Sequence, residues 1–146
     1  MNAAHGAVGF AALGLTATAA LVGAWCWWQV RTSAWFWRAL RASQAVIIVD
    51  VVLGGIDYLV YRKPPGLHVL YGVLPLLVSL IAEQLRIASA QMVLDARGHA
   101  SAQEVAALPA EEQRVVVLSI MQREIAVMTL SAVVNIVLLW RAWATA

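Results

Sequence analysis

The sequence of this 146-residue chain is poor in charged residues. Only 12% of its residues are Asp, Glu, Lys or Arg, whereas 62% are hydrophobic, and its mean hydropathy is +0.78. A soluble domain carries roughly 25% charged residues. The composition therefore excludes an ordinary soluble protein and indicates a membrane protein.

Cysteine is almost missing as well. Cys26 is the only one in the sequence, which excludes an intramolecular disulfide and a thiolate metal cluster. No Ser-His-Asp set, phosphate loop or zinc motif is visible, so a role other than catalysis is favoured. The ten basic residues are spread around the ends of apolar segments and form no strip that could follow phosphates, so nucleic acid is not expected as a partner.

Four apolar segments are long enough to cross a bilayer, which takes about 20 such residues. They span approximately residues 6–30, 40–61, 67–94 and 114–143. We predict an all-α protein with one domain (1–146), in which four transmembrane helices surrounded by lipid form a bundle. The first segment lacks a basic region and a clear small-x-small cleavage site, so we expect a mature helix and not a signal peptide.

The connection at residues 95–113 is polar and carries helix-start signals. Ser101 to Glu104 has the form of a capping box, and Pro109 followed by two glutamates suits a first helical turn. A fourth helix from about Ala110 to Trp143 would be roughly 50 Å long, whereas the hydrocarbon layer is about 30 Å thick. We expect the last two long helices to extend into the cytoplasm, either to dock a partner or as a solvated hairpin.

The basic residues also predict the orientation in the membrane. The first and third connections with their borders carry Arg31, Arg38, Arg41, Arg86, Arg97, Arg114 and Arg123, and the opposite side carries Arg62, Lys63 and Arg141. Because positive loops stay inside, we predict a multi-pass protein of a bacterial plasma membrane with both termini outside the cytoplasm.

Several polar residues fall inside the predicted spans, where charges are costly and usually face the interior of the helix bundle. Asp50 lies near mid-membrane, where we expect Asn135, Ser131 or Thr16 within reach, as a network anchor or a proton site. Asp57 lies near the outer level. At the inner rim we expect a structural clasp of two carboxylates and two guanidiniums, formed by Glu83, Arg86, Arg123 and Glu124.

Two histidines begin separate apolar segments, and each is followed four residues later by glycine: His5 by Gly9, and His68 by Gly72. Residues four apart share one face of a helix, so bare backbone follows each imidazole. A flat macrocycle with an axial histidine needs such a gap. The predicted topology puts both histidines at the same outer level, whereas His99 falls in a polar connection. The pair is therefore a candidate for metal ligation in haem, with a structural role as the alternative.

The region from Gln44 to His68 adds a resemblance to a known family. Gln44, the Leu-Gly-Gly sequence at 53–55, the prolines at 64 and 65 and then His68 resemble a helix–loop–helix of haem A synthases that bears a haem-ligand histidine. The segment from His5 to Gly9 resembles the other ligand helix of that family. The likeness covers mainly the first three helices and one of the two family halves. The second and third helices also resemble actinobacterial four-helix membrane proteins, which imply no function.

The resemblance implies a b-type haem between His5 and His68, with room made by Gly9, Gly54, Gly55 and Gly72. The chain departs from the family where it has Asn2 for a catalytic glutamate and Gly6 for an arginine, and it lacks the family's extracellular cysteine pair. Oxidation of a haem methyl group is thus not expected, and Arg62 and Lys63 would pair with the propionates in place of the missing arginine.

Three functions remain open at this point. The first is a cytochrome b-like protein for electron transfer or haem binding, which could form a homodimer because the family places two halves face to face. The second is a haem-free proton channel, ion channel or transporter that uses Asp50 and Asp57. The third is an accessory subunit of a larger membrane complex.

Overall fold

The computed structural model describes residues 3–60, 65–99 and 101–146. Its helices are α1 (Ala3–Trp28), α2 (Ala34–Val60), α3 (Gly66–Ala96), α4 (Ala102–Ala106) and α5 (Ala110–Ala144). No strand occurs in these three ranges. All helices except the short α4 are long and apolar enough to cross a membrane, which confirms the predicted class of an all-α membrane protein.

The observed helices are longer than the apolar segments. The largest difference is in α2, which begins at Ala34 and not near residue 40. No proline or glycine interrupts residues 34–39, so the helix continues through this stretch although its tryptophans and Arg38 suit a membrane border. Arg38 and Arg41 therefore lie on a helix and not in the first connection, where the sequence had placed them.

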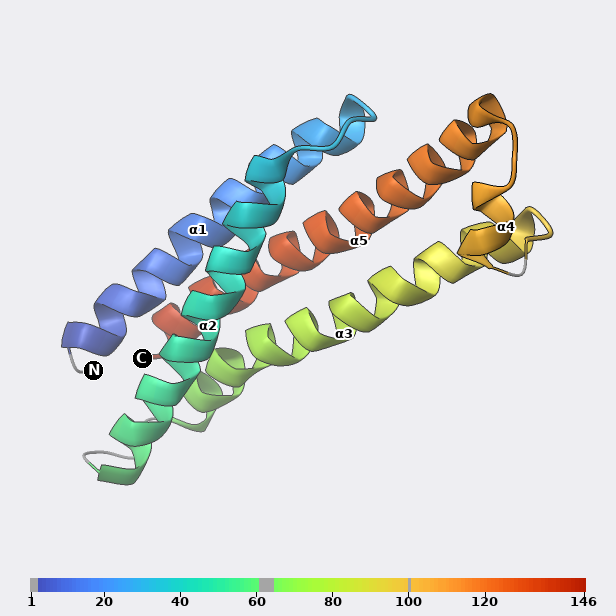
Figure 1. Cartoon of the computed structure of the whole chain (residues 1–146). Coiled ribbons are helices and arrows are strands. Elements are labelled where there is room, and N and C mark those ends of the chain that lie inside the picture. The colour runs from blue at the N-terminus through green and yellow to red at the C-terminus, as the bar shows by residue number, and fades with distance from the viewer. Residues whose placement is uncertain (1–2, 61–64, 100) are drawn as a thin grey trace.

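The long helices differ in how closely they pack (Figure 1). α1 packs against α2 and α5, and α3 packs mainly against α5, whereas α2 contacts α3 less. α3 and α5 run side by side past the turn between α1 and α2 and end at α4. Both ends of the chain lie where α2 ends and α3 begins. The two longest helices thus form one continuous pair, with α1 and α2 covering part of it.

Small residues make up much of the interior, together with large side chains such as Phe36, Ile47 and Met128, and many other large apolar side chains face outward. Ala12 and Ala19 are fully buried, while Leu21 is 74% exposed and Leu59 is 83% exposed. This distribution suits lipid surroundings, where close backbone approach stabilises helix pairs and burial of large apolar side chains brings no extra gain. The buried positions on these helices include several small or polar residues: Thr16, Ala20, Asp50, Pro75, Ser79, Ser131 and Asn135.

The end of α3 shows how the polar connection is built. Gly98 has φ +74° and its N–H donates to the Asp95 carbonyl, while the His99 N–H donates to the Leu94 carbonyl. This is a Schellman motif, which favours glycine at that position. The Ser101 hydroxyl then accepts from the Glu104 N–H at the start of α4, as the predicted capping box requires. A small apolar cluster joins α3, α4 and α5 at this end, and its buried residues are Val93, Leu94, Val105 and Val116.

Gly23 lies at the tightest contact among the glycines of the described chain. A Cβ added there would overlap Thr129 Oγ1 of α5 and lie 2.6 Å from Phe36 Cε2 of α2. Both Phe36 and Thr129 are buried, so neither can swing out of the way. Three helices therefore meet where only a hydrogen atom fits.

We expect Gly23→Ala to destabilise the protein by about 1–3 kcal/mol, because an extra methyl group in a packed interior forces the helices apart. Gly14 is the matched control, since it lies on the same helix and a Cβ there meets nothing within 4 Å. Gly14→Ala should leave stability unchanged or raise it by up to about 1 kcal/mol. Titration of the protein in mild detergent with dodecyl sulfate measures both, and equal midpoints would contradict the packing argument.

Candidate functional site

The structure brings His5 of α1 and His68 of α3 together. Their ring centroids are 5.8 Å apart and their planes are nearly perpendicular, at 88°. His5 lies in the first turns of α1, and His68 lies in the first turn of α3. The two imidazoles therefore face each other at one end of the helix pair, from segments far apart in the sequence.

Asp50 of α2 orients the ring of His5. Nδ1 of His5 lies 3.0 Å from Asp50 Oδ1, and the two side chains are only 11% and 13% exposed. The alignment is poor for a hydrogen bond, and neither atom has another partner among the described residues. Because a carboxylate only accepts hydrogen bonds, this contact favours the tautomer with the proton on Nδ1.

A backbone carbonyl orients the ring of His68. Its Nδ1 lies 2.8 Å from the carbonyl oxygen of Ala142 in the last turn of α5. The last carbonyls of a helix have no partner within the helix, and a carbonyl only accepts, so His68 also carries its proton on Nδ1. The Nε2 atom of each histidine makes no hydrogen bond within the described part of the chain. Both rings thus keep a free lone pair for a ligand or metal.

A cavity of about 350 Å³ adjoins the histidine pair. Its walls come from α2 and α3, and a Cβ on Gly55 or Gly72 would meet no atom within 4 Å. Gly54 is closer to the imidazole, because a Cβ there would lie 3.2 Å from Cε1 of His5. A smaller hollow of about 40 Å³, lined from α1 and α5, touches the same two histidines. The pair therefore stands between two spaces.

The predicted site residues divide into those near the cavity and those elsewhere. Gly54, Gly55 and Gly72 line the cavity with both histidines. Gly9 faces Asp50, with a would-be Cβ 3.6 Å from its carboxylate, so it belongs to the smaller hollow. Asp57 is half-buried and lines neither space. Arg62 and Lys63 lie outside the described residues.

The residues predicted to lie within reach of Asp50 make their hydrogen bonds with other groups. Asn135 donates from Nδ2 to the Ser79 hydroxyl at 3.0 Å, and the Thr16 and Ser131 hydroxyls donate to carbonyls of their own helices. A hydroxyl inside a helix readily satisfies itself one turn back. Asp50 pairs with His5 instead, because α1 places that ring beside it.

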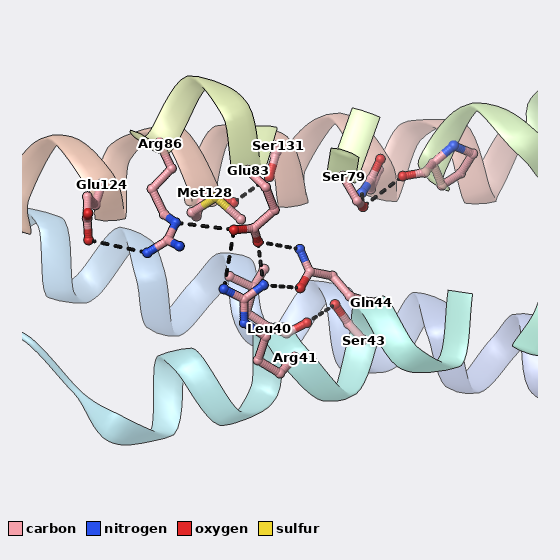
Figure 2. Close-up of polar contacts among 12 residues, drawn as sticks. Leu40, Arg41, Ser43, Gln44, Ser79, Glu83, Arg86, Glu124, Met128 and Ser131 are labelled. Atoms are coloured by element: carbon pink, nitrogen blue, oxygen red, sulfur yellow. Dashed lines mark hydrogen bonds and ion pairs between the residues drawn. The ribbon is translucent and has the colours of Figure 1, made fainter. Parts of the chain in front are cut away.

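A second polar cluster lies farther along the helices, and we call it the polar clasp (Figure 2). Glu83 of α3 accepts hydrogen bonds from both guanidinium nitrogens of Arg41, with Nη2 3.3 Å from Oε2. It also accepts from Gln44 Nε2 at 3.1 Å and from Arg86 Nε at 3.2 Å. Arg86 Nη1 lies 3.7 Å from Glu124 of α5. The polar clasp thus joins α2, α3 and α5 around one carboxylate.

The clasp differs in membership from the one predicted. Glu83, Arg86 and Glu124 belong to it as expected, but Arg123 is exposed and forms no ion pair within the described ranges. Arg41 and Gln44 were missed although both lie within the predicted second span, because Arg41 was taken only as a sign of the membrane border. They stand three residues apart and so share a helix face. That spacing was the available signal.

Comparisons with family models, with curated proteins and with solved structures find no match to this chain. The resemblance to haem A synthases stays a prediction. The function has to be argued from the geometry of the site.

We expect Glu83→Gln to destabilise the protein by about 2 kcal/mol, because two guanidiniums lose the charge that holds them. Glu124→Gln removes one long contact at a partly exposed site, so its cost should stay below about 1 kcal/mol. Titration with dodecyl sulfate in mild detergent compares the two variants. A larger loss for Glu124→Gln would show that Glu83 is not the centre of the polar clasp.

Proposed function

We propose that this protein is a small b-type haem protein of the membrane, in which His5 and His68 hold one haem as its two axial ligands. The observation that carries this proposal is the pair of adjacent imidazoles, each with an acceptor oxygen beside Nδ1 and no hydrogen bond at Nε2 within the described residues. Two imidazoles that each approach one metal to about 2 Å through Nε2 have centroids roughly 6 Å apart. The observed separation of 5.8 Å fits that arrangement.

The surroundings also fit a flat, largely apolar group. Gly54, Gly55 and Gly72 leave three positions of the cavity wall without side chains, with Gly54 next to His5, and the remaining wall is mainly apolar. A volume of about 350 Å³ is in the range of small-molecule sites. The smaller hollow on the other side of the pair adds room toward α1 and α5.

The partners of the two histidines have a defined task in this proposal. A carboxylate or a carbonyl at Nδ1 holds an imidazole in one tautomer and raises the basicity of Nε2. Asp50 does this for His5, and the Ala142 carbonyl does it for His68. Haem with histidine at both axial positions supplies reversible one-electron transfer. Because no axial position stays open, electron transfer or haem carriage is favoured over oxygen chemistry.

The resemblance to haem A synthases supports the same assignment, since both histidines stand in its motif positions. Asn2 and Gly6 replace the acidic and basic residues of the family motif, so we do not extend the proposal to oxidation of a haem methyl group. The role of Arg62 and Lys63 toward the propionates is a prediction from sequence. A homodimer or a larger complex is compatible with this function.

The orientation is part of the proposal. The four long helices form a transmembrane bundle, the histidine pair lies toward the outer side, and both termini are extracytoplasmic. The parts of α3 and α5 beyond the turn between α1 and α2 then extend into the cytoplasm with α4 (Figure 1). The basic residues around the first and third connections support this orientation.

We expect the protein, purified after expression with sufficient haem, to show a Soret band and the low-spin spectrum of bis-histidine ligation. His5→Ala and His68→Ala should each abolish that low-spin spectrum, because removal of one ligand opens an axial position. His99→Ala is the control, since His99 lies at the far end near α4. A wild-type protein without a Soret band, or an unchanged spectrum in His68→Ala, would contradict the proposal.

The glycines give a second test of the same site. Gly54→Ala should lower haem occupancy several-fold, because the added methyl group lies 3.2 Å from Cε1 of His5 and displaces the ring. Gly14→Ala, where nothing lies within 4 Å, should keep the wild-type occupancy. The ratio of Soret to protein absorbance after identical purification measures both variants. Equal ratios would mean that the position of His5 does not control binding.

A further inference from the structure

A further hollow, of about 650 Å³, is lined by the end of α1 and by α3 and α5. Beyond this end of α1, α3 and α5 continue side by side (Figure 1). The hollow is far from the histidine pair and takes no part in the proposed haem site. Its walls come from three helices, and the residues that carry the argument are Trp27, Val93, Arg97, Ser119, Gln122 and Arg123. The hollow combines two guanidiniums, a hydroxyl and an amide with an apolar wall.

The charges around this hollow are unbalanced. Arg97 donates from Nη2 to the Ser119 hydroxyl at 3.0 Å, and that hydroxyl donates onward to a carbonyl of α5. Arg123 has no hydrogen bond or ion pair with any described residue. No carboxylate lines the hollow. Its wall therefore offers positive charge and spare donors, as a phosphate requires.

The acidic residues next to Arg123 and Arg97 on α5 and α3 interact with other side chains. Glu124 lies beside Arg86, and Asp95 accepts a hydrogen bond from Gln91. Glu111 and Glu112 line a separate hollow near α4, which shares only Arg97 with this one. Arg123 thus has no carboxylate paired with it among the described residues, and Arg97 is the other cationic residue that lines the same hollow.

The position along the helices matches a membrane border. Arg123 stands about 30 Å along α5 from Trp143, at 1.5 Å per residue, which equals the thickness of a hydrocarbon layer. Trp27, in the wall of the hollow, belongs to the tryptophans at the end of α1, and tryptophan collects at membrane interfaces. The hollow therefore begins at the hydrocarbon border and extends into the headgroup region.

We propose that this hollow binds the phosphate headgroup of an anionic phospholipid. Arg123 and Arg97 contact the phosphate, and Ser119 and Gln122 are within the same wall for the polar part of the headgroup. Trp27 and Val93 pack against the glycerol and upper acyl region. Basic pockets between transmembrane helices bind anionic headgroups through this attraction between guanidinium or ammonium groups and phosphate. A soluble phosphate has no apolar part that could pack against this wall, and its binding would not require a site at the membrane border.

Native mass spectrometry of the protein released from mixed micelles of phosphatidylglycerol and phosphatidylcholine tests the proposal. We expect the wild-type protein to retain phosphatidylglycerol in preference to phosphatidylcholine. Each of Arg97→Gln and Arg123→Gln should lower that retention roughly fivefold, the usual effect of one cation near an anionic headgroup. Arg114→Gln is the matched control, because it removes the same charge from an exposed site on α5 outside the hollow.

The opposite outcomes are equally clear. Equal retention of both lipids by the wild-type protein, unchanged retention in Arg97→Gln and Arg123→Gln, or an equal loss in Arg114→Gln would each overturn the site. Inorganic phosphate at millimolar concentration is added in a parallel series. Displacement of the lipid by free phosphate would assign the hollow to a soluble anion, whereas undiminished lipid retention supports the headgroup. Circular dichroism of each variant confirms that its helices remain folded.

Discussion

The close approach of α1 to α2 and α5 is the contact on which the rest of the structure depends. Gly23 and the buried alanines of α1 permit this approach, because they place hydrogen atoms or single methyl groups between the backbones. In a bilayer, apolar side chains gain nothing by leaving lipid, so such packing and a few polar contacts supply most of the association energy. The same approach brings the first turns of α1 alongside α2, where His5 meets Asp50. A displaced α1 would leave this carboxylate without its neighbour.

Two polar clusters hold α2 in place, and together they explain the cavity. The polar clasp ties α2 to α3 and α5 through Glu83, and the contact between His5 and Asp50 ties α2 to α1. α2 and α3 contact each other less than α3 and α5, α1 and α2, or α1 and α5 do. The glycines at 54, 55 and 72 line the resulting space beside both histidines. The cavity thus lies where α2, held by the polar clasp and by the contact with His5, faces α3 across positions that carry glycine.

Much of the fold could be predicted from local pattern, and less of the site. The four spans follow from hydropathy and length, and the capping box at Ser101 follows from its spacing, because both depend on nearby residues. The membership of the polar clasp was only partly predictable. Arg41 and Gln44 were missed because Arg41 was taken only as a sign of the membrane border, and no local pattern shows which side chain of another helix these two residues meet. The contact between Asp50 and His5 was not predicted, and Asn135, Ser131 or Thr16 were expected near Asp50 instead, because depth along each helix says little about which faces meet.

The sequence by itself determined the class of the protein, its four apolar helices and the glycine that follows each of the two histidines at helical spacing. These properties depend on composition and on contacts within a turn or two. Only the tertiary structure decided that the ring centroids of His5 and His68 lie 5.8 Å apart. It also placed Asp50 beside Nδ1 of His5 and the Ala142 carbonyl beside Nδ1 of His68. It also decided that Gly54 lies against His5 while Gly9 faces Asp50. The physical reason is that helix rotation and tilt are set by packing between helices, and no single segment contains that information.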